Sequence, residues 1–227
     1  MRLLLVFLSE PLPGQVKSRL THAIGPERAE VVYRAMVRIL LAQLSGLEQC
    51  RIRFCHTPDD AGDALRLWLL TEVMEVPEIQ LAPEIMDFHP QGEGDLEDRI
   101  CRAAGNAFEE GYQKVAIISS DCIELSSRWI HAAFAQLNEQ HEVVAGPTTT
   151  GGHHLLAMQR YLPALLRQIS WSGTNAFQAT IQNATQEGIT LYQLPPLPEI
   201  GTENDYHQAL SGPMGRRLRK AIETFDP

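Results

Sequence analysis

Short apolar runs alternate with stretches of helical periodicity along almost the whole chain, and this alternation limits the possible folds more than any other feature. Runs typical of buried strands occur at residues 3–8, 51–55, 79–82, 115–118, 142–145, 155–158 and 189–194. Apolar residues recur at helical spacing at 26–47, 59–70, 96–108 and 127–137. Parallel neighbouring strands need crossover helices, and those helices cover both faces of the sheet. We therefore predict an α/β fold, a three-layer α/β/α sandwich with a mainly parallel mixed sheet.

The pattern predicts one domain over most of the chain, residues 1–210, with a largely helical stretch at 160–187 that breaks at 171–174. The remaining residues, 211–227, are basic and amphipathic and form a tail or a helix. Residues 87–95 are expected to be a loop rich in proline and glycine. Three further loops meet at the carboxyl ends of the strands, where open α/β sheets hold ligands: residues 9–20, 119–125 and 146–154.

Charge and apolar content exclude several classes of protein. The 227 residues carry a formal net charge of -9, which makes the chain a poor general nucleic-acid binder. No apolar run approaches the ~20 residues that cross a bilayer. The first run, at residues 3–8, ends too soon for a signal peptide. We expect a cytoplasmic protein without a membrane span, and the sequence does not define its oligomeric state.

The cysteines indicate a reduced protein. None of the four has CxxC spacing, and all lie in or beside apolar segments: Cys50, Cys55, Cys101 and Cys122. We interpret them as buried thiols rather than as disulfides or zinc ligands. Cys122 is interpreted as a small buried group, because no histidine or asparagine is recognisably placed to activate it as a nucleophile.

A carboxylate, Asp121, follows the buried run at 115–118 after two serines. Open α/β sheets place ligand and metal groups at this position. The alternative is that Asp121 caps the helix that follows. Its place after a strand favours contact with a hard cation or a ribose.

The loop after the first strand contains glycine and two cations. Gly14 would let the backbone approach a ligand closely, and Lys17 and Arg19 could meet phosphates. Neither GxxxxGK[ST] nor GxGxxG occurs after the first strand, so neither a P-loop NTPase nor a Rossmann dehydrogenase is supported. The alternative is a simple turn with solvated charges.

Two other segments combine glycines with polar groups. In the segment 91–99, Asp95 is a plausible N-cap whatever the function, and Arg99 lies four residues later, able to pair with it or to reach the cleft. In the loop 146–154, hydroxyl groups precede His153 and His154. Adjacent residues of a strand point to opposite faces, so at most one histidine is expected to face the cleft.

Together these segments resemble a known bacterial family. The loop at 11–20, the segments 91–99, 119–122 and 146–154, and Trp171 with Ser172 occur in the order found in a family of glycosyltransferase-like proteins with a domain of unknown function. The resemblance covers the chain to about residue 210. That family is similar to the GT-A, nucleotide-diphospho-sugar transferase fold, and to molybdenum cofactor guanylyltransferase and phospholactate guanylyltransferase.

The resemblance implies a transferase that uses a nucleotide-sugar or a nucleoside triphosphate with Mg²⁺ or Mn²⁺. Asp121 would hold the metal. Contacts to the nucleotide would come from Pro13, Gly14, Lys17, Arg19, Asp95, Arg99 and Ser120. The sugar or the acceptor would lie against Gly151, Gly152, His153, Trp171 and Ser172. The chemistry would be displacement at phosphorus or at an anomeric carbon.

The chain departs from the family pattern at five positions. The family has a lysine in place of Ser9, aspartates in place of Thr150 and Gly201, and tyrosines in place of His153 and His154. Two carboxylates and one cation are therefore absent from the expected site, which predicts weaker metal binding, altered substrate choice or lost catalysis. Glu199 and one histidine could compensate in part.

Two hypotheses of different class follow. The first is a glycosyltransferase or nucleotidyltransferase. The second is a catalytically silent relative that binds a nucleotide or a protein partner on the same scaffold. A phosphatase or a flavodoxin-like protein is less favoured, because the first strand has no DxD and no aromatic residues flank a flavin loop.

Overall fold

A seven-stranded mixed sheet runs through the molecule, and its strand order is β3-β2-β1-β4-β6-β5-β7. The computed structural model describes residues 1–226. The strands are β1 (Arg2–Ser9), β2 (Cys50–Thr57), β3 (Met86–Pro90), β4 (Lys114–Ser119), β5 (Val143–Pro147), β6 (His153–Met158) and β7 (Leu191–Gln193). β6 is antiparallel to both of its neighbours, and all other pairs are parallel.

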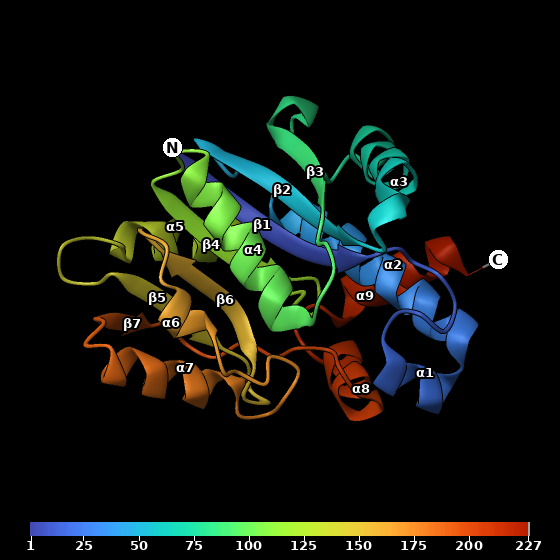
Figure 1. Ribbon diagram of the computed structural model, residues 1–227. Helices are drawn as coiled ribbons and strands as arrows, with labels where there is room; N and C mark the ends of the chain where they lie inside the picture. Colours follow the sequence, from blue (N-terminus) through green and yellow to red (C-terminus); the bar gives the residue numbers. More distant parts are fainter. Residues whose placement is uncertain (227) are drawn as a thin grey trace.

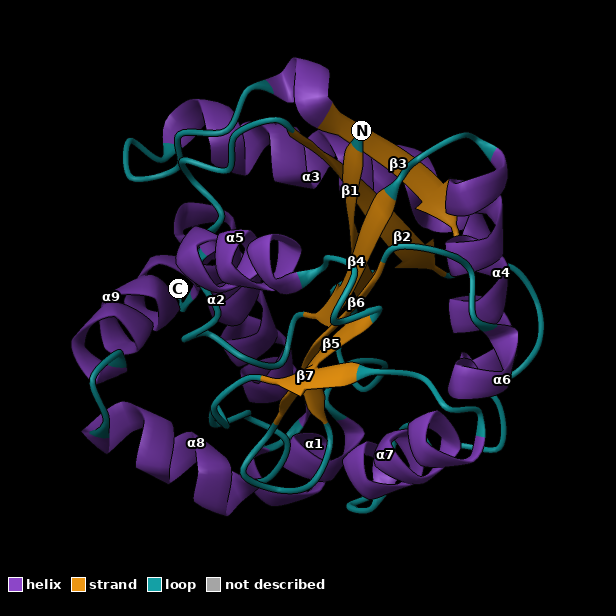
Figure 2. Ribbon diagram, turned by 90° about the vertical axis from the view of Figure 1, so that its left-hand side faces the viewer, coloured by secondary structure: helices purple, strands orange, loops and turns teal. Residues whose placement is uncertain are grey.

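Helices cover both faces of this sheet. They are α1 (Ser18–Ile24), α2 (Pro26–Gln43), α3 (Gly62–Glu75), α4 (Leu96–Glu109), α5 (Ser127–Gln136), α6 (Pro163–Leu166), α7 (Ala176–Gln186), α8 (Glu203–Ser211) and α9 (Gly215–Phe225), with 3₁₀ turns at Asp59–Ala61 and Pro83–Ile85. Figure 2 shows α2, α3 and α5 on one side of the sheet and α4 and α6 on the other. The predicted three-layer α/β/α sandwich is confirmed (Figure 1).

Alternation along the strands divides the core between the two faces. The even-numbered apolar residues of β1 pack with α2, α3 and α5, and its odd-numbered ones pack with α4 and α6. Because the central strands are buried on both faces, they are nearly continuous apolar runs in the sequence. This explains why apolar runs located β1 and β4 correctly, whereas β2, which contains Arg51 and Arg53, was located by its alternation.

Four expectations about local structure are wrong. Residues 79–82 form no strand: Ile79 and Leu81 are buried from a loop that packs on the core. The expected loop at 87–95 begins as β3. The expected loop at 9–20 ends in α1, which begins at Ser18. In the stretch 160–187 the expected break at 171–174 is confirmed, but it is longer than predicted, because helix occurs only in α6 and α7.

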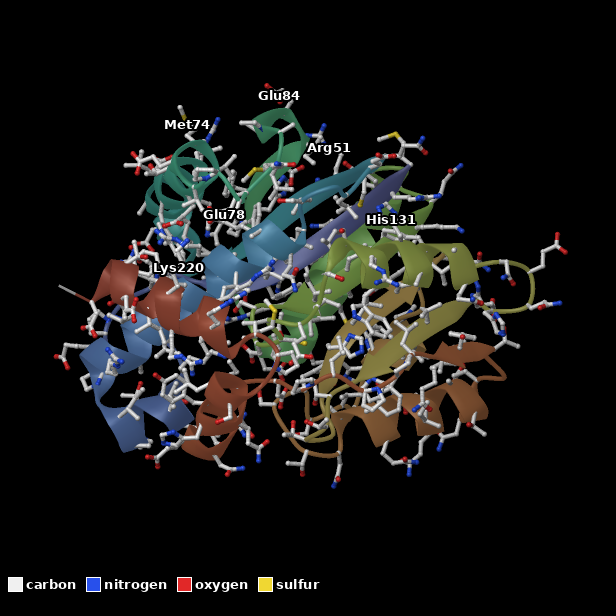
Figure 3. The ribbon with its side chains drawn as sticks, turned by 180° about the vertical axis from the view of Figure 1, so that it is seen from behind. Arg51, Met74, Glu78, Glu84, His131 and Lys220 are labelled. Carbon is white, nitrogen blue, oxygen red and sulfur yellow. The ribbon has the colours of Figure 1, made fainter. Side chains whose placement is uncertain are left out.

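The chain's last segment includes α9, which packs against α2. Leu218, Ala221 and Ile222 of α9 are buried in a cluster with residues of α2 and α8. Lys220, on the reverse side of the molecule in Figure 3, donates to Glu78 at 3.4 Å. A domain boundary at 210 stays a prediction, and residue 227 lies outside the described part of the chain. No helix among residues 1–226 is long and apolar enough to cross a membrane.

The packing of the core buries most of the cysteine thiols. All four cysteines are free, and Cys50, Cys55 and Cys122 are buried. Burial raises the pKa of Cys122 to about 12, so its thiol stays protonated at neutral pH.

Arg53 of β2 has a side chain that is only 5% exposed, and its guanidinium binds two carboxylates, Asp87 and Glu110. Burial opposes this charge, but the hydrogen bonds that Arg53 donates to Glu110 and Asp87 outweigh the effect of burial and raise the pKa of Arg53.

We expect Glu110→Gln to lower the free energy of unfolding at pH 7 by about 0.5 kcal/mol, because Glu110 is largely exposed and such ion pairs contribute little. The hydrogen bond from Arg53 lowers the pKa of Glu110 below 4.5. The stabilisation is therefore present above pH 4.5 and is lost as the pH falls through the folded-state pKa. Urea denaturation of both proteins between pH 7 and pH 3 measures it. Glu109→Gln, at an exposed neighbouring position, is the control; an equal effect of both variants at every pH would contradict the prediction.

Candidate functional site

A cleft of about 210 Å³ opens at the carboxyl ends of β1 and β4. Its polar lining consists of Arg19, Ser119, Asp121, His153, Ser172 and Glu199. Its apolar lining consists of Phe7, Leu96, Ile100, Ile117, Ile118, Leu156 and Trp171, with Gly152 and Gly173 between the two. Pockets that enclose a whole small ligand are larger, roughly 300–1,000 Å³. The cleft therefore encloses about one ring of a ligand and leaves the remainder at the surface.

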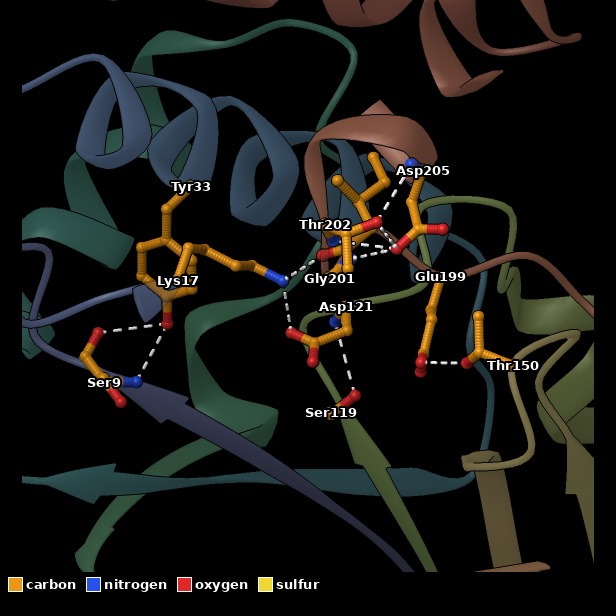
Figure 4. Close-up of polar contacts among 11 residues, drawn as sticks. Ser9, Lys17, Tyr33, Ser119, Asp121, Thr150, Glu199, Gly201, Thr202 and Asp205 are labelled. Atoms are coloured by element: carbon orange, nitrogen blue, oxygen red, sulfur yellow. Dashed lines mark hydrogen bonds and ion pairs between the residues drawn. The ribbon is translucent and has the colours of Figure 1, made fainter. Parts of the chain in front are cut away.

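Lys17 and Asp121 form an ion pair beside this cleft. Lys17 lies just before α1 in the left-handed region, with φ 52°. Its Nζ donates to Oδ1 of Asp121 at 2.6 Å and to the carbonyl of Ile200 at 2.7 Å (Figure 4). The Lys17 side chain is only 6% exposed, whereas that of Asp121 is 40% exposed. The two residues that the sequence assigned to a phosphate and to a metal thus bind each other.

Three segments that are distant in the sequence meet at this pair. The amide of Ile200 donates to the carbonyl of Asp121 at 2.9 Å, and the amide of Asp121 donates to Oγ of Ser119 at 3.3 Å. The loop after β1, the end of β4 and the segment after β7 are therefore tied together by backbone and side-chain hydrogen bonds. This arrangement holds the Asp121 carboxylate in one place at the edge of the cleft.

Arg19 lies over the backbone of Gly201. A Cβ at position 201 would be 2.7 Å from Nη2 of Arg19, so the guanidinium occupies space that a side chain would need. The amide of Gly201 donates to Asp205, which also accepts from Thr202 at the start of α8. Position 201 therefore contributes backbone and no carboxylate, and a cation fills the adjoining space.

Glu199 is a second carboxylate at the cleft. The hydroxyl of Thr150 donates to Oε1 of Glu199, and the hydroxyl of Thr148 lies 3.0 Å from that of Thr150. Thr150 occurs where the resembled family has an aspartate, so Glu199 supplies an acidic group near that position from another segment. From the sequence Glu199 is expected to compensate only in part, since one carboxylate in a proline-rich stretch carries no distinctive signal.

The two histidines point to opposite faces of β6. His153 lines the cleft, with its ring centroid 5.2 Å from that of Trp171. His154 is buried, and its Nε2 donates to the carbonyl oxygen of Pro195 at 3.1 Å. Burial is the main cause that lowers the pKa of each to about 4. Both imidazoles are therefore neutral at pH 7. His153 therefore contributes a neutral aromatic surface to the cleft and no positive charge, and its Nε2 lies 3.0 Å from the hydroxyl of Thr180.

Several residues expected to contact a nucleotide lie outside the cleft lining. Asp95 caps α4 by accepting from the amide of Asp98 at 3.0 Å. Arg99 donates to the carbonyl of Gly94 at 2.9 Å and supports the loop before α4. Ser120 is buried. Pro13, Gly14 and Lys17 are absent from the lining, as is Gly151, which was expected to contact the sugar or the acceptor. Of the expected residues, the cleft brings together Arg19, Asp121, Gly152, His153, Trp171 and Ser172.

The described residues do not fit a protein-held divalent cation. Within residues 1–226, no three histidine, cysteine or carboxylate side chains are placed to hold a metal ion. Asp121 already accepts from an ammonium, and Glu199 accepts from a hydroxyl. Mg²⁺ and Ca²⁺ need six or more oxygen ligands, and Mg²⁺ usually takes one or two carboxylates plus substrate phosphates. The Mg²⁺ or Mn²⁺ site expected at Asp121 is therefore not formed by these side chains.

The sheet order and the position of the cleft define a nucleotide-diphospho-sugar transferase-like fold. A candidate nucleotide-diphospho-sugar transferase from Desulfovibrio desulfuricans G20 is similar over 100% of this chain and 98% of its own, with a TM-score of 0.77 and 24% identity. A 4-diphosphocytidyl-2C-methyl-D-erythritol synthase from Anaerococcus prevotii is similar over 93% and 97%, with a TM-score of 0.58 and 10% identity. A cytidylyltransferase from Leptospira borgpetersenii is similar over 98% and 92%, with a TM-score of 0.51 and 11% identity. At these identities the likeness shows the fold.

Residues 40–173 match the family described as "Uncharacterized protein conserved in bacteria" (DUF2064). Because the match spans more than half of the chain, the chain belongs to this family. No curated protein matches the chain. The fold expected from the sequence is therefore confirmed, while the superfamily and the similarity to the two guanylyltransferases stay predictions.

Proposed function

We propose that the chain is a transferase that binds a nucleotide or a nucleotide-sugar across this cleft. The observation that carries the proposal is the meeting of a cation, Arg19, with an aromatic and apolar wall at the carboxyl ends of β1 and β4. In open α/β sheets this edge is where ligands bind. A diphosphate would lie beside Arg19, and the sugar or acceptor would lie against Trp171, Ser172 and His153.

The reaction would be a displacement. An acceptor oxygen forms a new bond to phosphorus or to the anomeric carbon, and the bond to the departing diphosphate or phosphate breaks with its electron pair. The acceptor's proton goes to a base or to water, and Glu199, which lines the cleft and also accepts from the hydroxyl of Thr150, is a carboxylate that could accept it. Arg19 would offset the charge on the departing group. The described side chains give Mg²⁺ or Mn²⁺ no site of their own, so such an ion would enter with the ligand's phosphates.

A catalytically silent binder on the same scaffold is the second candidate. It is favoured by the same observation that weakens the metal site: Asp121 is paired with Lys17, and positions 150 and 201 bring no carboxylate. The two candidates share ligand binding and differ in turnover. Release of free nucleotide from a nucleotide-sugar, or of pyrophosphate from a nucleoside triphosphate, separates them.

Arg19→Ala is expected to weaken nucleoside diphosphate binding by 10-fold or more, because charge-assisted hydrogen bonds contribute roughly 1.5–3 kcal/mol. Calorimetry with guanosine, uridine and cytidine diphosphates measures the affinity, and the predicted similarity to guanylyltransferases makes guanosine diphosphate the first probe. Arg217→Ala, an exposed arginine on α9, is the control. If Arg19→Ala leaves the affinity unchanged, the diphosphate does not bind beside Arg19, and the prediction is wrong.

A further inference from the structure

We infer that Lys17 supplies the positive charge that a divalent cation would otherwise supply beside Asp121, so that the cleft binds a diphosphate without metal. The inference rests on the proposed function, because it concerns how the same site tolerates an anionic ligand. The inference also goes beyond the proposed function, since it gives Lys17 the role that the resemblance gives to Mg²⁺ or Mn²⁺.

The contacts of the ammonium are those of a bound cation. Nζ of Lys17 lies 2.6 Å from a carboxylate oxygen of Asp121 and 2.7 Å from the carbonyl oxygen of Ile200. Carboxylate and carbonyl oxygens are also the ligands that hard cations take. An ammonium has three donors, and two of them have acceptors among the described residues, which leaves one for a ligand oxygen.

Burial strengthens the electrostatic interaction of the Lys17 ammonium with nearby anions. The Lys17 side chain is only 6% exposed, so water screens its interaction with nearby anions weakly. Asp121 lines the cleft with a side chain that is 40% exposed. Without Lys17, this carboxylate would repel a diphosphate at close range. With Lys17 bound, the pair carries no net charge, and Asp121 has one oxygen fewer for a metal.

The second cation completes the charge balance. Arg19 lines the cleft and occupies the space that a side chain at position 201 would need. The two carboxylates that the resemblance leads us to expect at positions 150 and 201 are absent from this chain. The Arg19 guanidinium lies against Gly201, and the Lys17 ammonium binds the carbonyl of the preceding residue, Ile200. With Lys17 and Arg19 set against Asp121 and Glu199, the charged side chains at this edge balance without a metal, and both cations remain next to the place of a diphosphate.

The test compares guanosine, uridine and cytidine diphosphates by calorimetry in EDTA and in Mn²⁺, on the wild type, Lys17→Met and Asp121→Asn. For the wild type we expect affinities that agree within about threefold in the two conditions. Lys17→Met should bind 10-fold or more weakly in EDTA and recover part of the loss in Mn²⁺, because Asp121 becomes free to hold the metal. Asp121→Asn should bind at least as tightly as the wild type in EDTA, because Lys17 keeps its charge.

A second readout does not depend on nucleotide. The electron paramagnetic resonance signal of Mn²⁺ alone should show no tight binding to the wild type and should show binding to Lys17→Met. A wild type that needs Mn²⁺ for diphosphate binding, or an Asp121→Asn variant that loses binding, overturns the inference and leaves the proposed function standing. No diphosphate binding in either condition overturns both. If Lys17→Met fails to fold, the wild type and Asp121→Asn still decide between these outcomes.

Discussion

Gly151→Ala is expected to lower the free energy of unfolding by about 3 kcal/mol, which combines roughly 1–2 kcal/mol for the left-handed backbone with 1–3 kcal/mol for overpacking. Gly151 has φ +95°, and a Cβ there would lie 1.8 Å from the carbonyl oxygen of Thr174. The contact is with backbone, so no rotamer change relieves it. The loop before β6 would have to move away from Thr174, which directly follows the cleft-lining residues 171–173.

The matched control for this substitution is Gly111→Ala. Gly111 has φ +90°, and a Cβ there would meet no atom within 4 Å. It therefore reproduces the backbone strain without the clash, and its expected cost is about 1–2 kcal/mol. Urea denaturation gives both values, and calorimetry with nucleoside diphosphates follows the cleft. Gly151→Ala should also weaken ligand binding, whereas Gly111→Ala should not. If the two variants lower the free energy of unfolding equally, the loop at Gly151 moves away from Thr174 without cost, and the prediction is wrong.

Most of the sheet could be predicted from the sequence because its central strands are buried on both faces. β1 and β4 are nearly uninterrupted apolar runs, which hydrophobic periodicity detects directly. The edge strand β3 was missed because it pairs only with β2 and carries Asp87, His89 and Pro90. An edge strand with one buried flank needs no continuous apolar run. Apolar residues at 79–82 were misassigned for the converse reason, since a loop can also bury them.

The candidate site was predictable in position but not in its internal contacts. Strand ends predict where side chains gather, and Arg19, Asp121 and the loop before β6 do meet at one cleft. The pairing of Lys17 with Asp121 spans 104 positions of sequence and depends on the left-handed backbone at Lys17. No local pattern encodes such a contact. The pairing changes the chemistry expected of both residues, so the metal site was the least predictable part.

The ion pair also predicts an asymmetry between its two members. Asp121→Ala is expected to lower the free energy of unfolding by about 2–3 kcal/mol, because it leaves the buried Lys17 ammonium without its counter-charge. Lys17→Met is expected to cost only about 1 kcal/mol, because the half-exposed Asp121 carboxylate can be hydrated once its partner is gone. Methionine also fills most of the volume of the lysine stem.

The double variant, Lys17→Met with Asp121→Ala, tests this explanation directly. If the cost of Asp121→Ala arises from a stranded charge, removing that charge should restore part of the lost stability. The double variant should then unfold at a higher urea concentration than Asp121→Ala alone. Asp121→Asn, which keeps an oxygen acceptor for Lys17, should lie between Asp121→Ala and the wild type. Additive costs in the double variant, or a larger cost for Lys17→Met than for Asp121→Ala, would mean that the ammonium at Lys17 is solvated and does not depend on Asp121.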